Sequence, residues 1–423
     1  MKRLGLILLA IAMLTMTVAC GKKKESAGGS SDGKVVIRFG WWGGDSRHKA
    51  TLEAIELFKK KYPNIDVKPE YAGWTGYNEK LTTQIVGNSA PDLMQVNWNL
   101  LYDLGSDKFL DLKGTDLDLN NYPADALKLV EIDGKTVAAP LGMSGRVFYY
   151  QKNAFDKAGV AIPKSFADLK AAGKAFQEKL GKGNYPLFLE DYRAFLMVLY
   201  YLEQTTGKPF IANNKVNYTV EELQKGFDFY LDLVKSGVTP SIAESQSGGV
   251  VPYDQEPRWI NGQFAGLYEW DSSAGKVSGS AQEGTEVVVG GVPTDFGKAA
   301  LFNKISMTYA INAKTKYPKE TALLLNFLLT DPEAVKAQKL ERGIPLNKAA
   351  FSILEGEGAL KGLQYEGYKT VVDNKGQGIS EYFESEELRK YYRTVMQELG
   401  TVTDSKQAAE KITKMVNDFL NTK

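Results

Sequence analysis

The chain alternates between strand-like and helix-like patterns from residue 35 to residue 96, and this alternation is the feature that most limits its fold. Residues 35–39 form a run of β-branched and aromatic side chains, and apolar residues at helical spacing follow at 52–58. The same two patterns recur at 65–71 and 77–85, and a third strand is predicted over 91–96. Alternating strands and helices favour a parallel sheet covered by helices on both faces. The sequence therefore predicts an α/β fold.

Farther along the chain, the predicted helices outnumber the predicted strands. Apolar stripes at helical spacing cover 223–234 and 388–399, whereas 286–290 and 305–311 are strand-like. A chain of 423 residues is long enough for two or three domains. We therefore expect a two-lobed α/β protein.

Two residue types that occur only once exclude whole classes of chemistry. The chain has one cysteine, Cys20, and one histidine, His48, so it cannot form an intrachain disulfide or a metal site built on several cysteines or histidines. The 52 basic and 51 acidic residues give a net charge of +1, which provides no field that favours a polyanion. We expect no nucleic-acid partner.

The N-terminus has the organisation of a secretory signal. Lys2 and Arg3 precede an uncharged apolar run over 4–19, which is shorter than the ~20 residues of a membrane-spanning helix. We predict a signal peptide over 1–19. Residues 17–20 resemble a bacterial lipoprotein cleavage site, which makes Cys20 the expected lipid attachment point on the outer side of the cytoplasmic membrane or in the periplasm. The alternative is a secreted protein with a free thiol.

Residues 20–33, which are rich in Gly, Ser and Lys, are predicted to be a flexible tether.

Motifs for catalysis, metals and phosphate are incomplete wherever they are suggested. The glycine-rich segment 290–299 has Val292 and Ala299 where a phosphate-binding loop needs glycine and a hydroxyl. The acidic segment 116–127 lacks the glycine and the final glutamate of a calcium loop. Neighbouring acids such as Glu269 and Asp271 are more often solvated than catalytic. We predict no catalytic residues, no metal site and no cofactor.

Tryptophan placement gives the strongest positive indication of function. The six tryptophans lie beside glycines, amides and carboxylates, and none falls on a predicted helix stripe. Aromatic faces attract the C–H groups of sugars, while neighbouring Asn and Asp side chains bind hydroxyls. We expect two to four of the six in a carbohydrate site, and the others in loop packing.

Arginine gives a second indication, because the chain has 43 lysines and only 9 arginines. A guanidinium binds a carboxylate through two parallel hydrogen bonds, which an ammonium cannot do. Five arginines lie in glycine-rich or aromatic contexts: Arg47, Arg146, Arg193, Arg258 and Arg342. Each alone is more often part of an interdomain ion pair. Arg47, at a predicted helix start beside His48, is the best candidate for an acidic ligand group.

From residue 35 onward the chain resembles the family 1 extracellular solute-binding proteins of bacterial ABC importers, in the oligosaccharide branch. The stretches that support this resemblance are IRFGWWGGDSRHKATLEAIELFKKKYPNIDV, GNSAPDLMQVN, VAAPLGMSGRVFYYQKNAF, WINGQFAGLYEWDSS and LERGIPLNK. The run WWGGDSRHK is similar to oligogalacturonide-binding members, which take up pectin fragments. The resemblance implies a periplasmic-binding-protein-like fold, in which two α/β lobes are joined by a multi-segment hinge with the ligand cleft between them.

The resemblance also implies a division of the chain and a set of cleft residues. Lobe 1 is expected to comprise 34–148 and 307–348, and lobe 2 to comprise 149–306 and 349–423, with crossings near Tyr149, Met307 and Leu346. The resemblance, together with the sequence contexts of the tryptophans and arginines, gives these predicted ligand-binding residues: Trp41, Trp42, Gly43, Asp45, Arg47, His48, Trp74, Asn97, Trp98, Arg193, Trp270, Tyr309 and Arg342.

The resemblance implies a lipid-anchored monomer that binds an oligosaccharide, closes around it and delivers it to separate permease subunits, without making or breaking bonds. An oligogalacturonide is the favoured ligand, and a neutral oligosaccharide is the alternative. A surface-anchored pectin hydrolase or lyase would use the same aromatic residues, but no paired acids or histidines share a loop with them. A small acid or a metal chelate fits six loop tryptophans less well.

Overall fold

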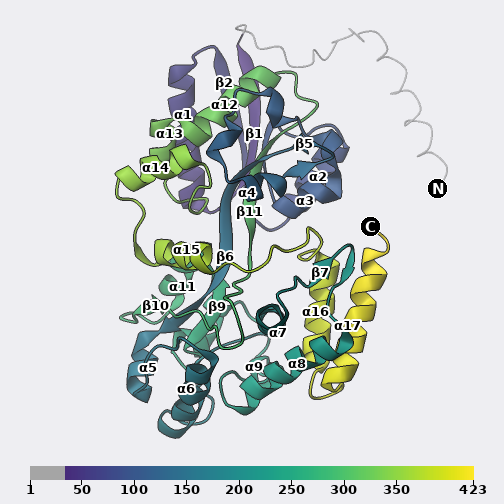
Figure 1. The fold of residues 1–423 in the computed structure, drawn as a ribbon. Coiled ribbons are helices and arrows are strands. Elements are labelled where there is room, and N and C mark those ends of the chain that lie inside the picture. Colours follow the sequence, from purple (N-terminus) through teal and green to yellow (C-terminus); the bar gives the residue numbers. More distant parts are fainter. Residues whose placement is uncertain (1–33) are drawn as a thin grey trace, which may run out of the picture.

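The computed structural model describes residues 34–423, in which the chain forms two lobes (Figure 1). The predicted signal peptide, tether and lipid-bearing Cys20 lie outside the described residues. In the described part of the chain, no helix is long and apolar enough to cross a membrane.

Lobe 1 is built on strands that come mainly from the start of the chain. Its strands are β1 (Val35–Trp42), β2 (Ile65–Ala72), β3 (Leu93–Val96), β4 (Glu131–Ile132) and β5 (Lys135–Thr136). Its helices are α1 (Asp45–Lys61), α2 (Tyr77–Val86), α3 (Trp98–Leu104), α4 (Ala124–Lys128), α12 (Pro318–Thr330), α13 (Pro332–Gln338) and α14 (Lys348–Gly356). The start of helix α13 is fixed by its own sequence, because the Asp331 carboxylate accepts hydrogen bonds from the Glu333 and Ala334 amides and a proline occupies the first turn.

Lobe 2 is mostly helical. Its helices are α5 (Lys152–Ala158), α6 (Phe166–Lys179), α7 (Asp191–Thr206), α8 (Val220–Lys235), α9 (Ile242–Ser245), α10 (Pro257–Ile260), α11 (Ala274–Ser280), α15 (Gly362–Asn374), α16 (Glu386–Glu398) and α17 (Ser405–Leu420). Its strands are β7 (Ile211–Ala212), β8 (Lys215–Val216), β9 (Gly266–Trp270) and β10 (Val287–Val289). Helix α7 is buried along most of its length, which places it at the centre of the lobe 2 core.

Two long strands, β6 (Ala139–Gln151) and β11 (Asn303–Ile311), connect the lobes (Figure 1). Residues 139–145 of β6 pair with β11, and residues 146–150 pair with β9. Strands of both lobes therefore belong to one 7-stranded sheet, with the order β10-β6-β11-β3-β1-β2 and with β9 also paired to β6, whereas β4-β5 and β7-β8 form separate 2-stranded sheets. Each lobe nevertheless has its own hydrophobic core, so the lobes are separate packing units.

The structure differs from the sequence expectations at three places. Strand β1 continues through Trp42 instead of ending at Phe39, the last residue of the predicted run 35–39, because it pairs with β2 along its whole length. The sheet is mixed, since β11 returns late in the chain and pairs antiparallel with β3. Helix α14 packs against α13 through Ala350 and Leu354, so the third passage between the lobes follows α14 instead of lying near Leu346.

Candidate functional site

A large cleft lies at the junction of the two lobes, with a volume of about 1180 Å³. Its lining residues come from three parts of the fold. Lobe 1 contributes the end of β1, the loop before α2, and helices α2 and α3; the crossing strands β6 and β11 contribute the second part; and lobe 2 contributes the end of β9 with the turn after it and the start of α16. A ligand in this cleft would contact both lobes and both crossing strands.

The lobe 1 wall of the cleft presents aromatic and amide side chains. The Trp42 ring packs against Trp74 and Tyr77, with ring centroids 5.2 Å apart in both pairs. Trp74 is 52% exposed, which is unusual for so large an apolar side chain. Asn78, Asn97 and other polar residues complete this wall. An exposed aromatic face bordered by amides suits the C–H and hydroxyl groups of a sugar ring.

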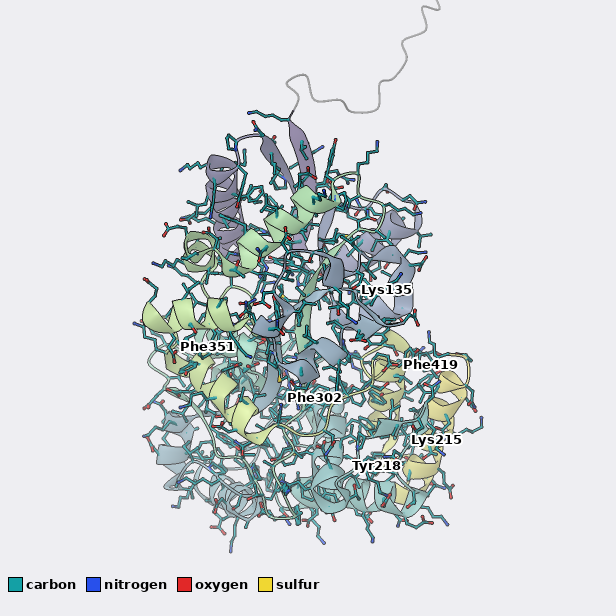
Figure 2. The ribbon with its side chains drawn as sticks, turned by 45° about the horizontal axis from the view of Figure 1, so that its top comes forward. Lys135, Lys215, Tyr218, Phe302, Phe351 and Phe419 are labelled. Carbon is teal, nitrogen blue, oxygen red and sulfur yellow. The ribbon has the colours of Figure 1, made fainter. Side chains whose placement is uncertain are left out.

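Trp270 is the aromatic residue of the opposite wall, at the end of β9. Its ring centroid lies 5.6 Å from that of Phe302, which Figure 2 places near the middle of the molecule. Two cations lie against the same indole: the Arg146 guanidinium is 4.7 Å from the ring centroid, and the Lys304 ammonium is 5.1 Å from it. Arg389, on α16, also lines the cleft. A cation over an indole face is stabilised by the ring quadrupole, and it still presents its donors to a ligand.

The Arg146 side chain is fixed by an ion-pair chain in lobe 2. Its Nη1 lies 3.4 Å from Glu269 Oε1 and donates to the Tyr268 carbonyl oxygen over 2.8 Å, whereas its buried Nε has no protein partner among the described residues. Glu269 also pairs with Arg193, which in turn pairs with Glu190. Burial alone would raise the pKa of Glu269, but Arg193 and Arg146 hold it at about 2, so this carboxylate stays ionised.

Lys304 forms an ion pair with Glu384, whose other carboxylate oxygen accepts a hydrogen bond from Tyr192. Burial lowers the pKa of Lys304, as do the nearby Arg389 and Arg146, whereas the contact with Glu384 favours the charged form. The cations Arg146, Lys304 and Arg389, which we call the hinge cation group, face three carboxylates, those of Glu269, Glu384 and Glu386. Lys304 and Arg389 each have their own carboxylate partner, whereas Arg146 shares Glu269 with Arg193.

Asp271 joins the cleft to the crossing strand. Its Oδ1 accepts hydrogen bonds from the Ser144 hydroxyl at 2.5 Å and from the Gly145 amide at 3.1 Å, and its own chain neighbour Ser272 donates at 2.8 Å. Burial raises the pKa of Asp271 to about 6, while these donors act in the opposite direction. The two donors on β6 fix the end of β9 against that strand.

Four of the sequence-predicted ligand residues line the cleft: Trp42, Trp74, Asn97 and Trp270. Three of the six tryptophans are therefore at the cleft. Of the others, Trp98 begins α3 and donates to the Leu129 carbonyl oxygen, and Trp259 is fully buried in α10.

The remaining predicted residues lie outside the cleft lining. The buried Trp41 donates to His48 Nδ1 at 3.1 Å, and both rings pack on Tyr71, on the other side of β1 from Trp42. Asp45 is exposed at the start of α1. Gly43 lies under the Arg47 side chain, where an added Cβ would be 2.7 Å from Arg47 Cδ.

Tyr309, Arg342 and Arg47 form a largely buried group inside lobe 1, behind Trp42, and Arg193 lies in the ion-pair chain behind Arg146. Helix packing and strand direction thus separate residues that are neighbours in the run WWGGDSRHK.

Lys304 and Arg389 of the hinge cation group have no distinctive sequence context. Arg146, in the glycine-flanked run SGRV, is one of the five arginines that sequence context singles out. The extra signal for Arg146 is its position in a strand long enough to cross from one lobe to the other.

Comparisons with known proteins agree with this geometry. The family model for bacterial extracellular solute-binding proteins matches residues 44–335. A periplasmic oligogalacturonide-binding protein of Yersinia enterocolitica, solved in complex with saturated digalacturonic acid, is 34% identical, with a TM-score of 0.83 over 92% of this chain and 99% of that chain. A periplasmic solute-binding protein of Pectobacterium atrosepticum is 35% identical, with a TM-score of 0.85 over the same shares of the two chains.

Several curated relatives match over shorter lengths. A maltooligosaccharide ABC transporter solute-binding lipoprotein of Streptococcus pneumoniae is 29% identical over 45% of this chain and 44% of its own. A binding protein of Brucella abortus is 30% identical over 35% of this chain, and the match spans 37% of that relative's length. The family match covers more than half of the chain, and the fold agrees along 92% of it. The chain therefore belongs to the bacterial extracellular solute-binding protein family, whose members are non-enzymatic transport components.

Proposed function

We propose that this protein is the substrate-binding component of an ABC importer and that it binds an acidic oligosaccharide, a pectin-derived oligogalacturonide, in the cleft between its lobes. The observation that carries this proposal is the hinge cation group beside Trp270. A uronate sugar has both features that this wall can bind, a ring with C–H faces and a carboxylate.

Arg146 is the best placed residue to bind the carboxylate. It is only 5% exposed, so its position is fixed before a ligand arrives, and its Nε has no protein partner among the described residues. A buried donor without a partner is destabilising, and a ligand oxygen would relieve this. A guanidinium held in this way binds a carboxylate with little loss of entropy.

The cleft is large enough for more than one sugar ring. Its volume of about 1180 Å³ exceeds the ~300–1,000 Å³ of typical small-molecule pockets. Trp42 and Trp74 on one wall and Trp270 on the other offer separate aromatic faces to successive rings. Serine hydroxyls and asparagine amides between them are suited to sugar hydroxyls: Asn78, Asn97, Asn99, Ser144, Ser272, Ser273 and Ser306.

Ligand binding would stabilise the closed arrangement of the lobes. The ligand would bridge both walls, so its affinity is higher for the closed form than for the open form, and binding shifts the population accordingly. The crossing strands β6 and β11, with the passage after α14, would bend, and permease subunits would recognise the closed form. The similarity to an oligogalacturonide-binding protein supports the acidic ligand, whereas the maltooligosaccharide relative supports the neutral alternative.

The proposed location follows from the sequence. Cleavage after residue 19 would expose Cys20 for lipid attachment, and the tether would hold the folded lobes near the permease. Expression with a radiolabelled fatty acid should label the natural protein and leave a Cys20→Ala variant unlabelled. Equal labelling of both proteins would exclude Cys20 as the anchor.

The ligand class is tested by calorimetry with three matched compounds: digalacturonate, its dimethyl ester and maltose. We expect digalacturonate to bind at least tenfold more tightly than the other two, and Arg146→Gln to remove most of that preference. Arg258→Gln is the matched control, because Arg258 stacks on Phe264 in lobe 2 and does not line the cleft. Tighter binding of maltose would support the neutral alternative, and shortened ligand recovered after incubation would support an enzyme.

A further inference from the structure

Arg47 and Arg342 form a second group of positive charge, inside lobe 1 and behind the cleft wall. The Arg342 side chain is 9% exposed, and its guanidinium lies 5.3 Å from the Tyr309 ring centroid. Arg47 reaches the same region from the first turn of α1. We call these two residues the lobe 1 arginine pair.

The hydrogen-bond acceptors of the pair are all neutral. Arg47 Nε donates to the Glu341 carbonyl oxygen at 2.8 Å, and its Nη1 donates to the Trp42 carbonyl oxygen at 3.3 Å. Arg342 donates to Gln95 Oε1 and Thr51 Oγ1, both at 2.9 Å, and to Gln338 Oε1 at 3.2 Å. Neither guanidinium forms an ion pair with a carboxylate among residues 34–423.

The charges of the pair affect each other. Burial lowers the pKa of Arg47 to about 10, with Arg342 as the next cause, and burial also lowers the pKa of Arg342. Glu341 is the nearby acid that offsets them in part, and its carboxylate accepts a hydrogen bond from Ser46 at 3.0 Å. Two largely buried like charges with neutral partners destabilise the fold, so a pure packing role explains their presence poorly.

The pair is connected directly to the cleft wall. The Trp42 carbonyl oxygen accepts hydrogen bonds from Arg47 Nη1 and from Gln95 Nε2, both at 3.3 Å, and Gln95 in turn accepts from Arg342. Trp42 lines the cleft on the other side of this carbonyl. The positive charge therefore lies one residue behind the surface that a ligand would contact.

The lobe 1 wall needs this charge if the ligand is acidic. The charged residues of lobe 1 that line the cleft are Glu79 and Asp103, and the cleft-lining cations of the described chain all come from the crossing strands and α16. Two carboxylates on this wall would repel a uronate that extends across the cleft. Positive charge behind Trp42 would reduce that repulsion.

We infer that Arg47 and Arg342 are specificity-determining residues that favour a carboxylated ligand at the lobe 1 wall by their charge, without touching the ligand. This inference rests on the proposed acidic ligand and extends it to residues outside the cleft. A unit charge about 10 Å from a ligand carboxylate, at an effective dielectric of about 20, changes affinity on the order of tenfold. Because the pair is buried, added salt should screen this effect less than it screens surface charge.

Paired variants that remove or keep the charge test the inference. Digalacturonate affinity is measured by calorimetry for the natural protein, Arg47→Gln and Arg47→Lys. Both variants lose the guanidinium geometry, but only Arg47→Gln loses the charge, so we expect about tenfold weaker binding for Arg47→Gln and less than threefold for Arg47→Lys. Equal losses in the two variants, or no loss in Arg47→Gln, would overturn the inference.

A second pair, Arg342→Gln and Arg342→Lys, gives the same comparison if an Arg47 variant fails to fold, which a melting curve detects. Failure of the two proposals is distinguishable. If the natural protein does not bind digalacturonate, the acidic ligand itself is wrong. If it binds digalacturonate and the charge-removing variants bind it equally well, only the role of the lobe 1 arginine pair is wrong.

Discussion

Trp270 is the side chain whose removal should most weaken ligand binding. It is half-buried at the end of β9, where its indole contacts Phe302 on one side and is flanked by Arg146 and Lys304. A sugar ring could cover roughly 80 Å² of the remaining indole surface, which at ~25 cal/mol per Å² contributes about 2 kcal/mol. Since ~1.4 kcal/mol is a factor of ten, Trp270→Ala should weaken Kd about 30-fold.

The loss could be larger, because Arg146 would also lose a partner that fixes its guanidinium. A cation over an indole contributes roughly 0.5–1 kcal/mol at a partly exposed site. The backbone should be unaffected, since the Trp270 amide donates to Glu269 Oε1 at 2.8 Å and β9 pairs with β6 through main-chain atoms. Binding and folding effects can therefore be separated.

Calorimetry with digalacturonate measures the effect, and Trp259→Phe is the matched control. Trp259 is fully buried in lobe 2 and donates from its indole nitrogen to Ser280 at 2.9 Å, so its replacement should lower the melting temperature and leave Kd unchanged. A Trp270→Ala protein that folds and binds within twofold of the natural affinity would refute the assignment of this wall as the ligand site.

Three further predictions concern the framework of the site. Burial raises the pKa of Glu203 to about 7, so the native state retains a proton that the unfolded chain releases near pH ~4.5. The free energy of unfolding should therefore fall as pH rises from about 5 to 8, and melting curves should show a smaller fall for Glu203→Gln. An equal fall in the variant and the natural protein would contradict this prediction. In Gly145→Ala, an added Cβ would lie 2.5 Å from Val371 Cγ1 of α15. This overpacking should lower the free energy of unfolding by about 1–3 kcal/mol in a denaturant titration. An unchanged midpoint would show that α15 shifts away from β6 at no cost in stability. Arg193→Met leaves Glu269 with one of its two arginine partners, so a denaturant titration should show a free energy of unfolding lower by about 3–5 kcal/mol. A loss below about 1 kcal/mol would show that Arg146 alone neutralises the Glu269 carboxylate.

The order of strands and helices could be read from the sequence because it depends on local periodicity. The pattern over 35–96 predicted β1, α1, β2, α2 and β3 in the order found, and the proline and cap at the start of α13 are equally local. The course of β6 is different. Its 13 residues pair with three strands from distant parts of the chain, and only those partners reveal that it crosses between the lobes.

The positions of the charged residues were harder to predict than the elements that contain them. The segment after Trp42 suggested that Arg47 would face the cleft, since it follows a tryptophan-glycine run at a helix start. In the fold, Arg47 extends across Gly43 to the Glu341 carbonyl oxygen, which lies almost three hundred residues later in the chain. A partner that distant leaves no local pattern, so sequence reasoning identified the arginine but not the direction of its side chain.

The separation of charge from the aromatic walls suggests how the cleft would work. Arg146 and Lys304 lie on the crossing strands, whose pairing Asn303↔Gly145 fixes their spacing within one sheet. Trp42 and Trp74 belong to lobe 1, so hinge bending would move them relative to Arg146 and Lys304. Trp270 would keep its position beside these two cations, because β9 pairs with β6. An acidic sugar would then meet its charge partners already in position in the open form, and the lobe 1 tryptophans would add their contacts on closing. On this reasoning, charge selects the ligand before the lobes close, and the aromatic faces determine how long it stays.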